Sequence, residues 1–228
     1  MDRDRPGGTM GTAWSRPLRL AVGAVTCFLV LAVLVATGTT QALDVEVVSH
    51  LRPRDAWGPA QVEWSPWMSR LQPGRMYLLL AATSAAAAAW RRSWWPLVFG
   101  AVLAGSSAAL TVLAKVALDR PDPHGWVATS GGSYPSGHVV ALLVCLSGCL
   151  LLVGPRVRWW LWAPVVVAAT LLSVSLLVSA AHWPSDVLGG ALLAVAVVGG
   201  LSSLSLRQRA VVPAPRNASS RGATTSAS

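Results

Sequence analysis

The sequence predicts an all-α, polytopic membrane protein built as a bundle of six transmembrane helices. Of its 228 residues, 54% are hydrophobic and only 12% are charged, and the mean hydropathy is +0.54. This composition is too apolar for a soluble domain of that length. A membrane-spanning helix needs about 20 mostly apolar residues, and the chain holds six candidate runs. They are residues 18–38, 76–90, 96–116, 139–154, 159–180 and 187–206.

The first run, residues 18–38, follows a polar segment, 1–17, that we expect to be a disordered cytoplasmic N-terminus. A basic flank before an apolar stretch is also the pattern of a secretory signal peptide. This stretch is long for a signal peptide, and further apolar runs follow it. We therefore predict an uncleaved first helix, with a cleaved signal as the alternative.

The longest polar segment is a predicted outer loop at about residues 39–75. It carries Trp57, Trp64 and Trp67 among several prolines. Tryptophans in such a segment usually anchor a chain at the membrane interface. The functional alternative is a lid, or a groove for an acyl chain, over an active site.

Two short turns follow, Trp90–Trp95 and Pro155–Trp160, and each combines two arginines with tryptophans. We expect the arginines to face water and the tryptophans to lie at the level of the lipid headgroups. The run before the first turn, 76–90, is short and rich in alanine. After the last run, residues 207–228 are rich in small and polar residues, which predicts a disordered cytoplasmic tail.

The distribution of charge predicts the orientation in the membrane. The sequence pI of about 11.2 could indicate a nucleic-acid partner. With the N-terminus inside, however, twelve arginines fall on the cytoplasmic side, whereas the opposite side holds six basic residues and seven of the nine acidic ones. This is the positive-inside pattern. We therefore expect a multi-pass protein of the cell membrane, with both termini in the cytoplasm and no nucleic-acid partner.

The three cysteines, Cys27, Cys145 and Cys149, all lie within apolar runs. A packing role is favoured over a disulfide or a metal site. No group of residues has the spacing of zinc ligands. The sequence therefore predicts no metal and no cofactor.

Two polar islands, residues 115–138 and 175–186, interrupt the apolar sequence, and we expect them to form one active site at the outer ends of the helices. Lys115 is the only lysine of the chain and lies near the end of a helix that Pro121 terminates. A lone lysine at a helix end usually extends its ammonium group to the membrane surface. Every other basic position is arginine, so a specific role for this amine is the alternative.

In the first island, Pro135, Ser136 and Gly137 form a turn that opens directly into an apolar helix. Backbone N–H groups at a helix N-terminus can bind an anion, and glycine allows a phosphate to approach the backbone closely. The hydroxyl of Ser136 adds a donor, and His138 would face the same anion. The simpler interpretation is an N-cap serine followed by an interfacial histidine.

In the second island, His182 precedes the start of the last helix, and Asp186 follows four residues later. A carboxylate bound to one imidazole nitrogen fixes the tautomer and leaves the other nitrogen free as a nucleophile or base. Taken alone, Asp186 is equally explained as an acidic residue favoured by the dipole at a helix start. The two islands together favour the catalytic interpretation.

These residues resemble the signature of the type 2 phosphatidate phosphatase superfamily, membrane lipid phosphatases that share their fold with vanadium-dependent haloperoxidases. Its members carry a lysine followed after six residues by Arg-Pro, then Pro-Ser-Gly-His, then Ser-Arg, five residues, His, three residues and Asp. Residues 135–138 match the second part completely, and Ser175, His182 and Asp186 match the third part at the correct spacing. The resemblance also covers the six-helix layout of residues 18–206.

The resemblance implies a metal-independent hydrolase and a role for each matching residue. His182 would attack phosphorus and become a phosphohistidine, oriented by Asp186. His138 would protonate the leaving group. The donors to the phosphoryl oxygens would be Lys115, Ser136 and Gly137.

Two positions depart from the family pattern, and in the family both hold arginines that bind phosphate. After Lys115 and six intervening residues the chain has Asp122, and Arg120 comes two residues early. At the second position Leu176 replaces arginine. Charge-assisted hydrogen bonds to phosphate contribute about 1.5 to 3 kcal/mol each, so two uncompensated losses would slow the reaction by several orders of magnitude. We expect Arg120 to bind phosphate in place of one lost arginine and an arginine of the outer loop to replace the other. The outer-loop candidates are Arg52, Arg54, Arg70 and Arg75.

Three functions are compatible with the sequence. The favoured one is an integral membrane phosphatase that hydrolyses a lipid phosphate or a polyprenyl pyrophosphate on the outer face. The alternatives are a catalytically weakened relative that binds such a lipid and an unrelated membrane transporter. Haloperoxidase activity is not expected, because oxyanion capture would depend even more on the missing arginines. Neither the lipid tail nor the oligomeric state follows from the sequence.

Overall fold

The computed structural model describes residues 16–127, 131–154 and 156–211, and within these ranges the chain is helical and contains no β-strand. The predicted all-α class is confirmed. The elements are α1 (Arg16–Ala36), α2 (Gln41–Leu51), the 3-10 helix η1 (Pro53–Asp55), α3 (Pro59–Arg70), α4 (Pro73–Arg91), α5 (Trp95–Leu118), α6 (Gly137–Val153), the 3-10 helix η2 (Trp159–Trp162), α7 (Ala163–Val178), α8 (Pro184–Ser203) and α9 (Ser205–Val211).

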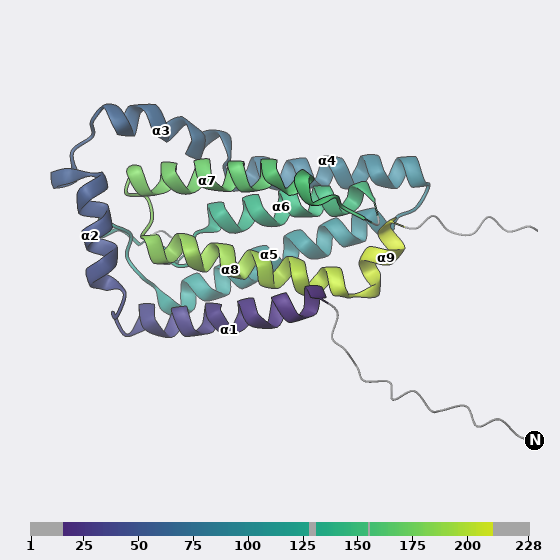
Figure 1. Ribbon diagram of the computed structural model, residues 1–228, viewed down its shortest axis with the longest axis horizontal. Coiled ribbons are helices and arrows are strands. Elements are labelled where there is room, and N and C mark those ends of the chain that lie inside the picture. The colour runs from purple at the N-terminus through teal and green to yellow at the C-terminus, as the bar shows by residue number, and fades with distance from the viewer. Residues whose placement is uncertain (1–15, 128–130, 155, 212–228) are drawn as a thin grey trace, which may run out of the picture.

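The helices α1, α4, α5, α6, α7 and α8 run along the long axis of the molecule, and each corresponds to one apolar run of the sequence (Figure 1). Among the described residues, four helical stretches are long and apolar enough to cross a membrane: α1, α5, α8 and the stretch Trp159–Val178, which joins η2 to α7. α6 is also strongly apolar over 17 residues, and the Ala-rich α4 extends over 19. The chain is thus a multi-pass helical membrane protein.

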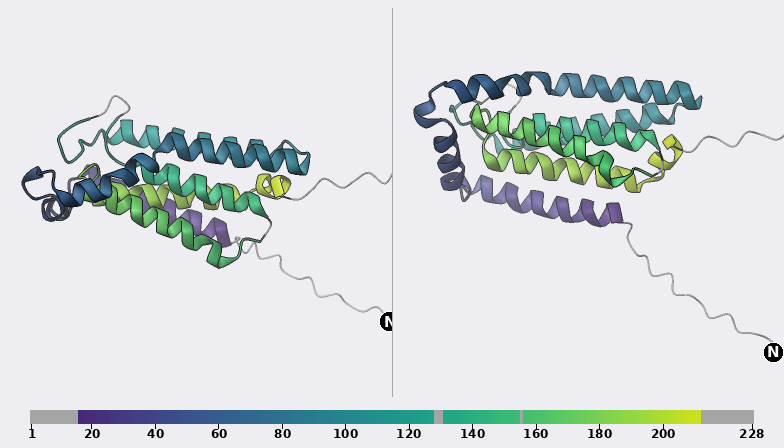
Figure 2. Two further views of the ribbon diagram at one scale, coloured as in Figure 1. Left: turned by 90° about the horizontal axis from the view of Figure 1, so that it is seen from above. Right: turned by 45° about the horizontal axis from the view of Figure 1, so that its top comes forward.

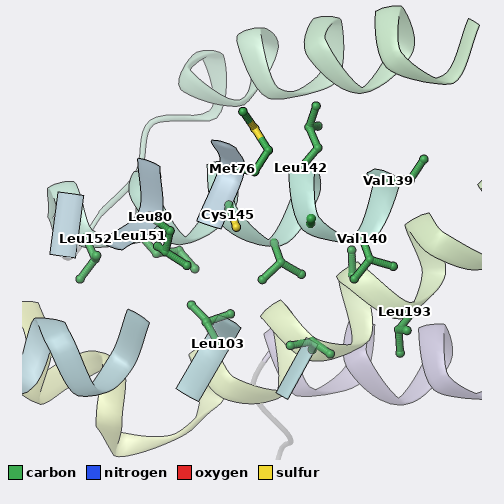
Figure 3. Close-up of a cluster of buried hydrophobic side chains, with 14 of the residues drawn as sticks. Met76, Leu80, Leu103, Val139, Val140, Leu142, Cys145, Leu151, Leu152 and Leu193 are labelled. Carbon is green, nitrogen blue, oxygen red and sulfur yellow. The ribbon is translucent and has the colours of Figure 1, made fainter. Parts of the chain in front are cut away.

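α6 forms the centre of the bundle. It packs against α4, α5, α7 and α8, and most of its side chains are buried, as expected of a helix that is apolar around its circumference. Leu142, Cys145 and Leu152 are at most 1% exposed and share one buried cluster with Leu80 of α4 and Leu103 of α5 (Figure 3). Cys145 therefore has the packing role that the sequence predicts.

α1 lies at the periphery and packs mainly against α8. Ala21 is buried in this contact, whereas Leu20 and Leu29 are more than half exposed; on a spanning helix such outward apolar side chains face lipid. Small residues let the two backbones approach closely. A Cβ added at Gly199 of α8 would lie 2.9 Å from the carbonyl oxygen of Pro17. The start of α1 therefore lies beside the end of α8.

The segment between α1 and α4, predicted as an outer loop, is largely helical. α2 crosses one end of the bundle, and α3 lies along α7 (Figures 1 and 2). Gln61 of α3 donates to the carbonyl oxygens of Leu51 (3.1 Å) and Val178 (3.0 Å), and the Ser175 hydroxyl donates to the carbonyl oxygen of Trp64 (2.7 Å). Because prolines and tryptophans mask any apolar periodicity in this segment, its helices were not predicted.

At the opposite end of the bundle, α9 continues past the predicted start of the tail. Ala210 is fully buried there, and the half-buried Arg91 donates to the carbonyl oxygens of Leu152 (2.5 Å) and Ala210 (3.2 Å). Arg91 thus binds backbone carbonyls, whereas the sequence analysis predicted that it faces water. Residues 207–211 are thus helical, where the sequence predicted a disordered tail. The remainder of the predicted tail and the segment before Arg16 lie outside the described residues.

Candidate active site

The two polar islands meet at the end of the bundle that α2 crosses (Figure 1). The backbone N–H of Ser136 donates to the carbonyl oxygen of Asp186 (3.0 Å), which joins the turn before α6 to the first turn of α8. The rings of His138 and His182 lie with their centroids 6.3 Å apart and their planes inclined by 69°. The structure therefore places the two histidines singled out from the sequence next to each other.

Asp186 orients the ring of His182. Its Oδ2 lies 3.3 Å from Nδ1 of the imidazole and also accepts the backbone N–H of Trp183 at 3.1 Å. Asp186 is fully buried, and His182 is 9% exposed. With the proton assigned to Nδ1, facing the carboxylate, Nε2 keeps its lone pair. Because His182 also lines a cavity, this lone pair is available to an electrophile bound there.

Lys115, in the last turn of α5, holds the loop that precedes α6. Its ammonium group donates to the carbonyl oxygens of Gly132 (2.5 Å) and Ser133 (3.3 Å). Gly131 has φ +98°, and a Cβ added at Gly132 would lie 2.2 Å from the backbone nitrogen of Arg120, so both positions require glycine. An ammonium group has three donors, which leaves one for an anion in the cavity that Lys115 also lines.

The start of α6 supplies further hydrogen-bond donors. Ser136 is fully buried, and its hydroxyl has no hydrogen-bond partner within the described part of the chain. A buried polar group without a partner costs about 1 to 3 kcal/mol, so an anion that accepts from this hydroxyl would be favoured. Gly137 begins the helix and lines the cavity, where the N–H groups of the first turn have no partner inside the helix.

A cavity of about 340 Å³ lies between Lys115 and the two histidines, and neither Ser136 nor Asp186 is part of its described wall. Its volume is at the lower end of the range for small-molecule sites. Across residues 16–211, apart from the undescribed 128–130 and 155, no group of three or more His, Cys, Asp or Glu side chains is arranged to hold a metal ion. The wall of the cavity includes Lys115, Gly137, His138, His182, Asp122 and Trp126.

The two positions that depart from the expected pattern add no positive charge to the cavity. Asp122 lines the wall, and its Oδ1 accepts the backbone N–H groups of His124 and Trp126, both at 2.9 Å. The carboxylate therefore closes a turn of its own loop. Leu176 is fully buried and belongs to the hydrophobic core.

Arg120 turns inward, as expected from the sequence, but its guanidinium group binds two carboxylates of the protein. Nη1 donates to Oδ1 of Asp186 (2.9 Å), and Nη2 donates to Oδ2 of Asp44 (2.7 Å). Arg120 is 8% exposed and is not part of the cavity wall. Arg52 of the outer segment donates to the carbonyl oxygen of Ser179 (2.9 Å). The described wall of the cavity includes none of the four outer-segment arginines.

Asp44 and Ser185 lie beside the site, and neither was predicted from the sequence. Oδ1 of Asp44 accepts the backbone N–H of Ser185 (3.0 Å), and Oδ2 accepts its hydroxyl (2.6 Å). The partners of Asp44 lie 76 residues away, at Arg120, and 141 residues away, at Ser185. No local spacing could reveal contacts at such separations.

The contact between α8 and the turn before α6 depends on Gly190. A Cβ added there would lie 2.8 Å from the carbonyl oxygen of Ser136 and 3.1 Å from Cβ of Val139. We expect Gly190→Ala to destabilise the fold by about 1 to 3 kcal/mol through overpacking. Gly200→Ala, on the same helix, is the matched control, because a Cβ there meets nothing within 4 Å. Thermal unfolding in detergent measures the effect, and equal unfolding temperatures for the two variants would contradict it.

The chain is similar in sequence to known phosphatases. The family model of the PAP2 superfamily matches residues 93–210, which contain both islands. A lipid A 1-phosphatase of Porphyromonas gingivalis is 36% identical over 83 residues, 36% of this chain and 18% of the relative. An undecaprenyl-diphosphatase of Sulfolobus acidocaldarius is 44% identical over 62 residues, 27% of this chain and 28% of the relative. The chain therefore aligns with less than a third of the length of either relative.

A solved structure shares the fold. The crystal structure of a transmembrane PAP2 type phosphatidylglycerolphosphate phosphatase from Bacillus subtilis matches with a TM-score of 0.69. The match covers 80% of this chain and 94% of that chain at 19% sequence identity. At this level of identity the likeness establishes the fold, and it confirms the predicted helical membrane architecture.

Proposed function

This chain belongs to the PAP2 superfamily, as the resemblance predicted, and on that premise we propose that it is a membrane phosphatase. It hydrolyses a lipid phosphate or a polyprenyl pyrophosphate through a phosphohistidine intermediate. One observation carries the proposal: two histidines share one cavity, His182 with Asp186 on its Nδ1 and His138 with its ring 6.3 Å away. This arrangement supplies a nucleophile and a proton donor to the same phosphoryl group.

The reaction proceeds in two steps. In the first, Nε2 of His182 attacks phosphorus, the bond between phosphorus and the leaving oxygen breaks, and His138 gives its proton to that oxygen. The positive charge that develops on the ring of His182 is stabilised by Asp186. In the second step, His138 takes a proton from water, the resulting hydroxide attacks phosphorus, and inorganic phosphate leaves as the phosphorus–nitrogen bond breaks.

The phosphoryl oxygens are bound by donors that line the cavity or lie beside it. Lys115 contributes a charge-assisted hydrogen bond, and the first turn of α6 contributes backbone N–H groups at Gly137 together with the hydroxyl of Ser136. The Ser136 hydroxyl has no hydrogen-bond partner among the described residues, which supports this role. Arg120, which the sequence analysis expected to bind phosphate, acts instead through Asp186.

We place the site on the extracytoplasmic side of the membrane. α8 begins beside the site and ends near the start of α1, and its 20 residues span about 30 Å. That length is close to the thickness of the hydrocarbon core. The far end of the bundle carries the arginine-rich turns, and arginine-rich segments face the cytoplasm. Both termini are then cytoplasmic.

The substrate is a lipid whose phosphate enters the cavity while its tail stays in the bilayer. A volume of about 340 Å³ accommodates a phosphorylated headgroup but not a long acyl or prenyl chain. The named relatives act on lipid A and on undecaprenyl diphosphate, which supports this class of substrate and not an unrelated transport function.

A second candidate, a weakened relative that binds a lipid phosphate without efficient turnover, is favoured by one observation. The cavity wall that the structure describes contains the carboxylate of Asp122 and no arginine. Negative charge on that wall opposes the binding of phosphate. The assay below distinguishes the two functions.

The protein purified in detergent is offered phosphatidate, phosphatidylglycerophosphate and undecaprenyl pyrophosphate in the presence of a chelator. We expect phosphate release from at least one of these lipids, because the proposed mechanism uses protein groups alone. Binding of the lipids without release would favour the weakened relative. Neither binding nor release would contradict both functions.

A further inference from the structure

Asp44 is a carboxylate with 1% exposure on α2, a helix whose other residues are exposed or half-buried. Both of its oxygens accept hydrogen bonds: Oδ1 from the backbone N–H of Ser185, and Oδ2 from the Ser185 hydroxyl and from Nη2 of Arg120. A buried charge is tolerated only where it is paired and hydrogen-bonded. These contacts anchor α2 to the first turn of α8.

The guanidinium group of Arg120 joins Asp44 to the carboxylate that orients the nucleophile. Nη1 donates to Oδ1 of Asp186 at 2.9 Å and to the hydroxyl of Ser185 at 2.7 Å. The side chains of Asp44, Arg120 and Asp186 are 2%, 9% and 0% exposed. A continuous series of contacts therefore runs from Asp44 through Arg120 and Asp186 to His182.

We propose that Asp44 is a positioning residue for the reaction and acts on His182 through Arg120 and Asp186. This inference rests on the proposed function. Asp44 binds Nη2 of the guanidinium group, so Asp186 contacts only Nη1. The second oxygen of Asp186, Oδ2, stays directed at His182. Helix α2 is thereby part of the active site, although none of its residues lines the described cavity.

The charges show why a second carboxylate matters. Asp44 and Asp186 share the single positive charge of Arg120, so negative charge is left beside the imidazole of His182. A negative neighbour stabilises the positive charge that develops on the ring as Nε2 attacks phosphorus. Without Asp44, the whole positive charge of the Arg120 guanidinium would face Asp186. The guanidinium would then compete with His182 for Oδ2 of Asp186.

The test compares Asp44→Asn, which keeps the shape of the side chain, with Glu46→Gln as the matched control. Glu46 lies on the same helix, and its side chain is exposed. We expect Asp44→Asn to lower kcat by about tenfold or more while KM changes by less than about threefold, because the phosphate donors are untouched. In an Arg120→Gln background, Asp44→Asn should lower kcat no further, because the guanidinium through which Asp44 acts on Asp186 is already absent.

Two results would overturn the proposal. One is a kcat for Asp44→Asn equal to that of Glu46→Gln. The other is a double variant of Asp44→Asn and Arg120→Gln whose loss of kcat equals the two single losses combined. If Asp44→Asn does not fold, Ser185→Ala takes its place, since it removes the hydroxyl that contacts both Asp44 and Arg120. Its kcat should fall with KM unchanged, and an unchanged kcat would contradict the positioning role.

A wild-type protein that releases no phosphate would contradict the proposed function. It would not contradict the positioning of His182 by the contacts that begin at Asp44. The positioning role is then measured with orthovanadate, a phosphate analogue that bonds to an imidazole nitrogen. Orthovanadate should bind about tenfold more weakly to Asp44→Asn than to Glu46→Gln, because His182 is no longer held in place. Equal affinities would overturn the proposal on this second measurement.

Discussion

Replacing His182 with alanine is expected to lower kcat by about 10⁴-fold or more, because the covalent route is lost when its nucleophile is removed. The substitution leaves the phosphate donors of α5 and α6 in place, so substrate should still bind. The measurement is phosphate release from the detergent-purified variant under single-turnover and steady-state conditions.

The matched control is His50→Ala. His50 is exposed on α2, and its Nδ1 lies 2.8 Å from the carbonyl oxygen of Glu46 one turn earlier. This variant should keep wild-type turnover. A folded His182→Ala protein that retained more than about a tenth of the wild-type kcat would exclude His182 as the nucleophile.

Replacing His138 with alanine is expected to lower kcat/KM by about 10²- to 10⁴-fold for a lipid phosphate, because the leaving alkoxide is no longer protonated. The size of the loss should depend on the leaving group. A nitrophenyl phosphate releases a weakly basic phenoxide that needs little protonation, so the same variant should lose far less activity on that substrate.

The ratio of the two losses is the informative quantity. A loss of equal size on both substrates would show that His138 contributes to binding or folding and does not act as an acid. Its ring lies beside His182 and lines the same cavity, which is the geometry that a shared phosphoryl group requires.

The architecture could be predicted because apolar runs long enough to span a membrane determine the helices directly. The turn at residues 135–137 predicted the start of α6. His182 was expected to precede the start of the last helix, and α8 begins two residues after it. Two helices that begin at the same face of a membrane bring their N-terminal residues together, so the convergence of the two islands followed from topology.

The supporting network could not be predicted, because its contacts join residues far apart in the chain. Asp44 and Gln61 lie in a segment without apolar periodicity, and their partners are a guanidinium group, a serine and backbone carbonyls elsewhere. The partners of Arg120 also escaped prediction. Arg120 was expected to reach a phosphate, but two carboxylates within hydrogen-bond distance bind its guanidinium group instead.

The two positions where the family has arginine hold residues with other structural roles in this chain. Leu176 extends the core around α7, and Asp122 closes its own loop. In the proposed mechanism, phosphate binding therefore depends on Lys115 and on uncharged donors at the start of α6. A site with so few fixed positive charges relies on how accurately its nucleophile is held, which is the role proposed for the contacts from Asp44 to His182.

The central claim is that phosphate passes through a covalent bond to His182, and trapping that bond tests it most directly. The wild-type protein is mixed with a lipid substrate labelled in the phosphoryl group, quenched in alkali within its first turnover, digested and sequenced by mass spectrometry. We predict acid-labile phosphate on the peptide that contains His182 and none on the same peptide of the His182→Ala variant. Label on a different residue, or rapid turnover without any labelled protein, would contradict the account.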